Sequence, residues 1–198
     1  MKRLLVNALL AGGMLVFISS CNDATTDETA KTDSLAATPN QGDTSTTMTQ
    51  TAMHDDAKFA MEAAEGGMME VQLGKLASTR ATSSAVKQHA KMMVEDHSKA
   101  NAELKQLAAS KNITLPDSLS GEKQNDIKDL SEKKGADFDK AYTDFMVDDH
   151  KKDVDKFKEA SEKCNDADLK AWAAAKLPTL QSHLQMWQAI KDGTPMKH

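Results

Sequence analysis

Several residue types are scarce in this chain of 198 residues, and each scarcity excludes a class of protein. Aromatic residues make up only 4% of the chain, and there are four prolines, nine glycines and two cysteines. These values exclude a collagen-like repeat and a disulfide-rich scaffold. β-Sheets favour the aromatic residues that are rare here, whereas the abundant Ala, Lys, Glu and Met favour helices. The composition therefore predicts an all-α protein.

The sequence also has no excess of basic over acidic residues. The chain has 25 Lys and Arg against 30 Asp and Glu, so its net charge is −5. Binding to nucleic acid needs a basic patch that neutralises phosphates, and no block of basic residues occurs in the body of the sequence. We also find no Ser/His/Asp order, no phosphate-binding glycine loop and no nucleotide fingerprint. The sequence predicts neither a nucleic-acid partner nor an enzyme.

The N-terminus has the pattern of a secretory signal. Lys2 and Arg3 precede an apolar run, residues 4–18, that is too short to cross a bilayer as a mature helix. The run ends in Ile18-Ser19-Ser20-Cys21, which resembles the lipobox of bacterial lipoproteins. Residues 1–20 would then be a signal peptide, and Cys21 an anchor that carries lipid such as palmitate. An ordinary secretory peptide with a chance cysteine is the alternative.

The resemblance to a lipobox implies where in the cell the protein is located. We expect a lipid-anchored protein of the cell envelope, held at the outer membrane with the lipid bilayer as its partner. Thr supplies ten of the residues from 22 to 53, and this segment has little to bury. We therefore interpret residues 21–54 as the lipidated cysteine and a disordered tether. Residues 55–192 form the expected folded domain, and residues 193–198 a tail.

The folded domain shows helical spacing throughout. Apolar residues recur every three or four positions in four long segments, about 56–80, 84–111, 137–162 and 167–191, with a short helix at about 122–133. Four such amphipathic segments predict a four-helix bundle with a short extra helix between the second and third long helices. The connection over residues 112–134 is long enough for either an up-down topology or a crossover along the bundle.

Several motifs together resemble one bacterial family, domain of unknown function 4142, over about residues 56–191. The residues that carry the resemblance are Phe59 with Ala63-Ala64, Glu70, Leu73-Gly74-Lys75-Leu76-Ala77, Met93-Val94 with Asp96-His97, Phe138-Asp139 with Tyr142, Met146 with His150, and Leu177-Pro178 with Leu180 and His183. The resemblance implies a ferritin-like helical fold and an envelope location, often as a lipoprotein. It implies no reaction.

Four polar residues interrupt the apolar stripes, one in each long helix: Glu70, His97, His150 and His183. Glu70, His97 and His150 fall near the midpoints of their helices, and His183 about a turn past its midpoint, so we expect at least the first three side chains to converge on one layer of the bundle. Three imidazoles and a carboxylate suit Zn²⁺, Fe²⁺, Mn²⁺ or Cu²⁺. The sequence thus offers a divalent transition metal as a cofactor.

A network without metal is the other interpretation of these residues. Asp96 and Asp149 directly precede His97 and His150, and reciprocal Asp–His hydrogen bonds between the two helices would satisfy the imidazoles. A ferritin-type di-iron site is disfavoured, because the Glu expected three residues before each ligating His is Val94, Val147 or Leu180. From sequence we favour the network over the metal site, and the metal site over a catalytic role.

Two functions follow from these interpretations. The first is a membrane-anchored helical bundle that serves as a non-catalytic interaction or stress-related structural protein, with a protein partner that the sequence does not identify. The second is a metal-binding ferritin-like domain with Glu70, His97, His150 and His183 as ligands, and with Asp96 and Asp149 as supporting residues.

Overall fold

The structure is a computed structural model that describes the backbone of residues 44–194 and the side chains of 53 and 55–194. The chain divides into two units, Met1–Pro39 and Asn40–His198, and the described residues all belong to the second. The predicted signal peptide 1–20, Cys21, residues 22–43 of the tether and residues 195–198 of the tail lie outside the described residues.

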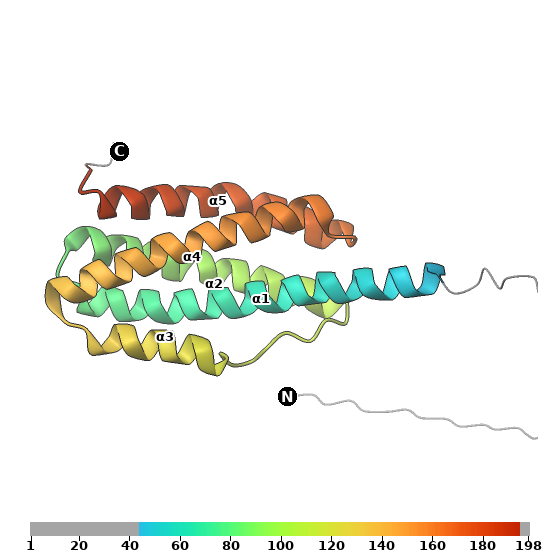
Figure 1. The fold of residues 1–198 in the computed structure, drawn as a ribbon, viewed down its shortest axis with the longest axis horizontal. Helices are drawn as coiled ribbons and strands as arrows, with labels where there is room; N and C mark the ends of the chain where they lie inside the picture. The colour runs from blue at the N-terminus through green and yellow to red at the C-terminus, as the bar shows by residue number, and fades with distance from the viewer. Residues whose placement is uncertain (1–43, 195–198) are drawn as a thin grey trace, which may run out of the picture. The chain divides into compact units, whose positions relative to one another are not determined.

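Five helices account for nearly all of residues 44–194: α1 (Thr44–Arg80), α2 (Ser84–Ser110), α3 (Gly121–Glu132), α4 (Gly135–Lys163) and α5 (Ala167–Lys191). No strand occurs in this part of the chain. The prediction of an all-α, four-helix bundle with a short helix between its second and third long helices is confirmed. The bundle is formed by α1, α2, α4 and α5, and α3 packs outside it against α1 and α4 (Figure 1).

The start of α1 differs from the sequence prediction. The helix begins at Thr44 and not near residue 56, so residues 44–54 are helical although we assigned them to a disordered tether. Adding a residue to an existing helix is far easier than nucleating one. The packed body of α1 provides that nucleus, so the helix extends into a segment whose own composition favours disorder.

The long connection between α2 and α4 crosses the length of the bundle. Asp139, in the first turns of α4, accepts hydrogen bonds from Thr82 N and Ser83 N, at 3.0 and 2.7 Å, where α2 begins. The starts of α2 and α4 therefore lie at the same end, so these helices run parallel, as Figure 1 shows. Between the two topologies that the sequence leaves open, the structure has the crossover.

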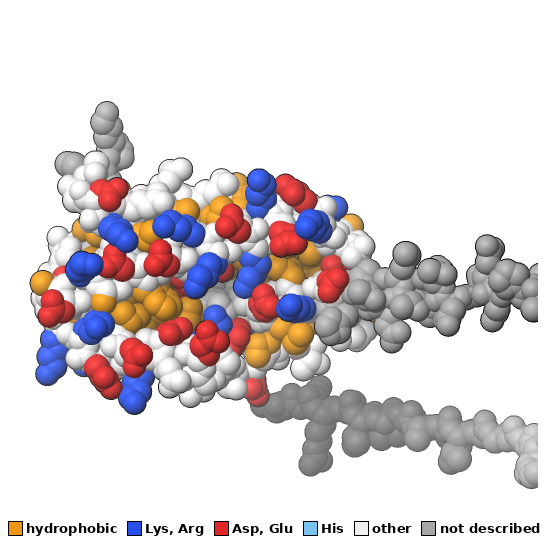
Figure 2. Space-filling model, viewed as in Figure 1, with side chains coloured by type: hydrophobic (Ala, Val, Ile, Leu, Met, Phe, Trp, Pro, Cys, Tyr) orange, Lys and Arg blue, Asp and Glu red, His pale blue; other side chains and the backbone are white. Residues whose placement is uncertain are grey.

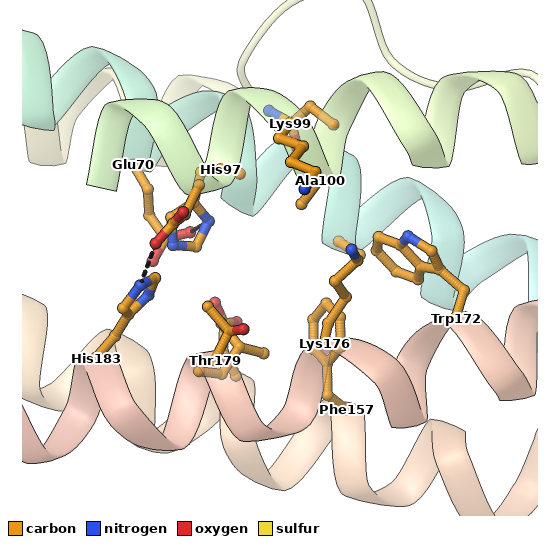
Figure 3. Close-up of a pocket in the computed structure, with 15 residues that line it drawn as sticks. Glu70, His97, Lys99, Ala100, Phe157, Trp172, Lys176, Thr179 and His183 are labelled. Atoms are coloured by element: carbon orange, nitrogen blue, oxygen red, sulfur yellow. Dashed lines mark hydrogen bonds and ion pairs between the residues drawn. The ribbon is translucent and has the colours of Figure 1, made fainter. Parts of the chain in front are cut away.

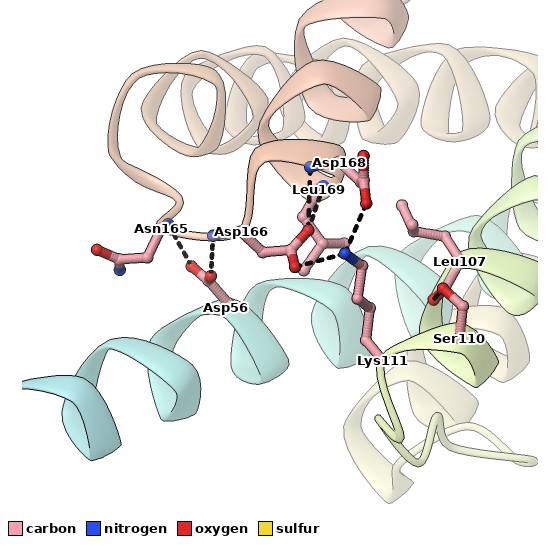
Figure 4. A network of polar contacts seen from close by, with 8 residues as sticks. All are labelled: Asp56, Leu107, Ser110, Lys111, Asn165, Asp166, Asp168 and Leu169. Carbon is pink, nitrogen blue, oxygen red and sulfur yellow. Dashed lines mark hydrogen bonds and ion pairs between the residues drawn. The ribbon is translucent and has the colours of Figure 1, made fainter.

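Polar contacts fix the opposite end of the bundle (Figure 4). Asp166 caps α5 by accepting hydrogen bonds from Asp168 N and Leu169 N, both at 3.0 Å. Lys111 Nζ, just past the end of α2, lies 2.7 Å from Asp166 and 2.6 Å from Asp168. Asp56 of α1 accepts from Asn165 N and Asp166 N, at 3.0 and 2.7 Å. These contacts hold α1, α2 and α5 in register.

The hydrophobic core consists of two separate clusters along the bundle. One contains Phe138, Tyr142, Met146 and Trp187, and the other contains Phe59, Leu104, Phe157 and Leu169. On α2, α4 and α5 a buried histidine, His97, His150 or His183, lies between the residues of the two clusters, and on α1 Glu70 lies at the edge of the first. A polar layer therefore divides the apolar core near its middle.

The surface is of mixed charge. On the face in Figure 2, acidic and basic side chains alternate, and neither sign forms a broad patch. Among the helices of residues 44–194, none is long and apolar enough to cross a membrane.

We predict that Asp139→Asn destabilises the fold. The substitution replaces a charged acceptor that holds Thr82, Ser83 and the start of α4 together, so the free energy of unfolding should fall by about 1–3 kcal/mol. Urea unfolding followed by circular dichroism measures the change. Asp137→Asn, at an exposed position in the same turn, is the control and should stay within about 0.5 kcal/mol of wild type. Equal stability of the two variants would contradict the assigned role of Asp139.

Candidate metal centre

The structure brings the four polar residues that interrupt the apolar stripes into one buried layer. Glu70 comes from α1, His97 from α2, His150 from α4 and His183 from α5. Their exposed fractions are 1%, 6%, 0% and 2%. The imidazole ring centres lie 5.4 to 5.7 Å apart in all three pairs. One ring nitrogen of each histidine lies within 4.8 Å of a ring nitrogen of the other two, which is close enough for a single ion to contact all three.

Each histidine has an oxygen atom close to one ring nitrogen. His150 Nδ1 donates to the Met146 carbonyl at 2.9 Å, one turn back on the same helix. His183 Nε2 donates to Asp96 Oδ2 at 2.9 Å. His97 Nδ1 lies 2.7 Å from Glu70 Oε2. Carbonyl and carboxylate oxygens only accept, so these contacts place the ring hydrogen on the partnered nitrogen of His150 and His183.

The second nitrogen of each ring is buried and makes no hydrogen bond. These atoms are His97 Nε2, His150 Nε2 and His183 Nδ1. In a neutral imidazole the nitrogen without hydrogen carries the lone pair that binds a metal. His150 Nε2 faces Glu70 Oε1 at 3.4 Å, but the angles are not those of a hydrogen bond. The layer therefore contains three imidazoles in close proximity, each with one ring nitrogen free of hydrogen bonds, and the carboxyl group of Glu70 beside them.

Burial keeps the histidines neutral. It lowers the pKa of His150 to about 3 and the pKa of His183 to about 4, and it also lowers the pKa of His97. The other imidazoles of the cluster add to the effect at His150 and His183, because neighbouring positive charges would repel one another. Neutral imidazole is the form that coordinates metals, so the three rings need lose no proton to bind an ion at neutral pH.

The two aspartates that we expected to hydrogen-bond the histidines make other contacts than predicted. Asp96 is bonded to His183 of α5, and not to His150 of α4 as the reciprocal arrangement required. Asp149 makes no hydrogen bond to any histidine within residues 53–194, and its Oδ2 is buried without a hydrogen bond. The reason is the crossover, which makes α2 and α4 diagonal partners and places α5 beside α2.

A cavity of about 120 Å³ leads to the layer. Glu70, His97 and His183 lie at one end of it, and Phe157, Lys176 and Trp172 lie towards the other (Figure 3). Closed structural zinc sites have no such opening, whereas sites that exchange ions or bind further ligands keep one. The cavity gives an ion a path to the imidazoles of His97 and His183.

Sequence reasoning missed two residues of this region. Asp153 lines the cavity and lies close to Glu70 and Asp149. Its spacing from Asp149, four positions along one helix, was the available signal. Tyr142 entered the sequence analysis only through the family resemblance, but its hydroxyl is buried without a hydrogen bond, and burial together with Glu70 raises its pKa.

The profile of one protein family matches residues 39–190, and its description is Domain of unknown function (DUF4142). The chain belongs to the DUF4142 family. The resemblance found in the sequence is thereby confirmed, and the four residues of the polar layer all fall within the matched region of this DUF4142 chain. A comparison with curated proteins finds no match.

Three solved structures share the helical fold of this DUF4142 protein. A DUF305 protein from Streptomyces coelicolor is 15% identical, with a TM-score of 0.59 over 72% of this chain and 95% of that one. A DUF305 fragment from Deinococcus radiodurans is 10% identical, with a TM-score of 0.62 over 70% and 95%. A conserved hypothetical protein from Mycobacterium tuberculosis is 13% identical, with a TM-score of 0.57 over 75% and 96%. At these identities the likeness concerns the fold alone.

We predict that Glu70→Gln changes the pH dependence of stability. Burial, and then Asp149, raise the pKa of Glu70 well above its ordinary value of 4.5. The folded chain therefore holds this proton more tightly than the unfolded chain, and wild type loses stability as the pH rises above 4.5. The variant lacks this loss, so its stability relative to wild type should increase as the pH rises above 4.5, by at most about 1.4 kcal/mol per pH unit.

Urea unfolding in EDTA at several pH values measures this difference. Glu95→Gln, on the exposed side of α2, is the control and should show a constant difference from wild type. A constant difference for Glu70→Gln as well would contradict the burial of an ionisable carboxyl in the layer.

Proposed function

We propose that this DUF4142 protein binds a divalent transition-metal ion through His97, His150 and His183, with the carboxylate of Glu70 beside them, and that it does so as a lipid-anchored protein of the cell envelope. The proposed role is binding of the ion. It takes up the second of the two functions that the sequence suggests.

The unpaired nitrogens carry the proposal. Three ring nitrogens on three helices are buried without a hydrogen bond, while the opposite nitrogens of His150 and His183 are bonded to a carbonyl and a carboxylate, and that of His97 lies 2.7 Å from Glu70. Metal-binding histidines have this arrangement, because the outer partner fixes the ring and raises its basicity. A network without metal would leave three buried acceptors unsatisfied, each at a cost of about 1–3 kcal/mol. One ion satisfies all three.

The kind of ion follows from the donor set. Three neutral imidazoles and one carboxylate suit Zn²⁺, Cu²⁺, Fe²⁺ or Mn²⁺, whereas Ca²⁺ prefers oxygen ligands only. Glu70 Oε2 faces His97 at 2.7 Å and Oε1 faces His150 at 3.4 Å, so the carboxylate lies beside the imidazoles that would hold the ion. The anion also offsets the positive charge that the ion brings into an apolar core.

The envelope location rests on sequence. Cys21 and its lipobox lie outside the described residues, so support comes from the pattern Ile18-Ser19-Ser20-Cys21 after an apolar run. An acylated Cys21, followed by a Thr-rich segment, would hold the domain near the membrane surface. The domain would then meet the metal ions of the envelope compartment.

We predict that Zn²⁺ stabilises the protein and that His97→Ala abolishes the effect. The chain is produced from its full sequence without a polyhistidine tag and is stripped with EDTA. An ion at a concentration of 100 times its dissociation constant should add about 2.7 kcal/mol to the free energy of unfolding. Thermal melting with and without Zn²⁺, and elemental analysis after dialysis, measure the effect.

The matched control is His89→Ala. His89 is also a buried histidine of α2, but its ring packs on Trp187, away from the cluster, and its Nδ1 is bonded to Ala85 O at 2.8 Å. This variant should lose some stability and keep the full response to Zn²⁺. If wild type binds no Zn²⁺, Cu²⁺, Fe²⁺ or Mn²⁺, or if His97→Ala responds like His89→Ala, the proposed site is wrong.

The anchor is tested separately. Wild-type protein made in a Gram-negative host should sediment with the membranes and incorporate labelled palmitate. Cys21→Ser should do neither, because serine has no sulfur to form the thioether bond to the lipid. Ser20→Ala, which leaves the cysteine in place and keeps a small residue before it, is a control for changes in the lipobox region. Membrane association of Cys21→Ser equal to that of wild type would exclude the anchor without affecting the metal site.

A further inference from the structure

A second group of possible ligands adjoins the histidines. Carboxylate oxygens of Glu70, Asp149 and Asp153 lie within 4.8 Å of one another. Asp149 and Asp153 are four residues apart on α4, so both project from the same side of that helix towards Glu70 of α1. Glu70 belongs to both groups, because its other contacts are to His97 and His150.

These carboxylates lack the partners that buried anions normally have. Both oxygens of Glu70, which is 1% exposed, and Oδ2 of Asp149 are buried without a hydrogen bond. Within residues 53–194, no Lys or Arg forms an ion pair with any of the three. Three lysines, Lys123, Lys152 and Lys156, line the neighbouring cavity, and Lys156 pairs with Glu62 at 3.1 Å. Three negative charges this close repel one another, and a cation or protons in direct contact with them would offset that repulsion.

We propose that Glu70, Asp149 and Asp153 bind a second divalent cation, next to the ion held by the three histidines, with the Glu70 carboxylate bridging the two. This inference rests on the proposed function, because Glu70 takes part in both sites. The two ions would differ in their ligands: one has mainly nitrogen and the other has only oxygen from the protein.

The ligand set selects the second ion. Three carboxylates are hard oxygen donors, which suit Mn²⁺, Fe²⁺ or Mg²⁺ rather than Cu⁺. Asp149 and Asp153 also line a separate cavity of about 370 Å³ between α1, α3 and α4. That cavity gives the oxygen-rich site its own approach from solvent and space for water to complete the coordination of the ion.

Mn²⁺ is the probe for this site, because its electron paramagnetic resonance reports both the number of ions and the distance between them. The full chain, untagged and stripped of metal, is titrated with MnCl₂, and the signal of free Mn²⁺ gives the number bound. Wild type should bind two Mn²⁺ per chain and show the broadened, exchange-coupled spectrum of a close pair.

Asp149→Asn/Asp153→Asn should bind one Mn²⁺ and show an uncoupled spectrum. Asn keeps the shape of Asp and removes two of the repelling charges, so the metal-free variant should be at least as stable as wild type. The matched control is Asp148→Asn, at an exposed position next to Asp149, which should bind two. Asp153→Asn alone serves as a second variant if the double variant melts early.

The outcomes separate the two proposals. One Mn²⁺ in wild type, unchanged in the double variant, overturns the second site and leaves the histidine site intact. Two Mn²⁺ in both proteins also overturns it, because the second ion then binds elsewhere. Binding of no Mn²⁺, with Zn²⁺ still bound through His97, overturns the second site alone, whereas binding of neither ion removes both.

Discussion

The burial of four ionisable side chains in the middle of an otherwise apolar core is the constraint on which the rest of this structure depends. Glu70, His97, His150 and His183 separate two hydrophobic clusters that could have been continuous. A polar atom in such a place costs free energy unless it is bonded, and several here are not. The cation proposed here would offset this cost through the nitrogens that make no hydrogen bond.

The fold keeps that layer in register from both ends. Asp139 joins the starts of α2 and α4, and Asp56 and Lys111 fix α5 at the opposite end. The crossover through α3 makes α2 and α4 parallel, so α5 packs beside α2 and brings His183 to Asp96. The connection between the hairpins thus decides which aspartate orients which histidine.

The layer could be predicted from the sequence because a residue at the midpoint of a helix keeps its depth in the bundle when the direction of the helix is reversed. Glu70, His97 and His150 lie near helix midpoints, and such residues meet whether neighbouring helices run parallel or antiparallel. The partners of the layer were harder to predict, because they depend on how each helix is rotated and on its neighbours. For this reason Asp149 was wrongly expected to hydrogen-bond a histidine, and Asp153 was missed. The first turns of α1 were missed because a packed helix extends into residues of weak helical preference.

X-ray absorption at the zinc edge, on untagged protein loaded with one equivalent of Zn²⁺, tests the central claim most directly. The metal–ligand distances, together with the scattering from the more distant atoms of the imidazole rings, give the number of imidazoles around the ion. The account predicts three imidazole nitrogens at about 2.0–2.1 Å and carboxylate oxygen at about 2.0–2.2 Å. A shell of oxygen without imidazole, or a sulfur ligand at about 2.3 Å, would contradict it.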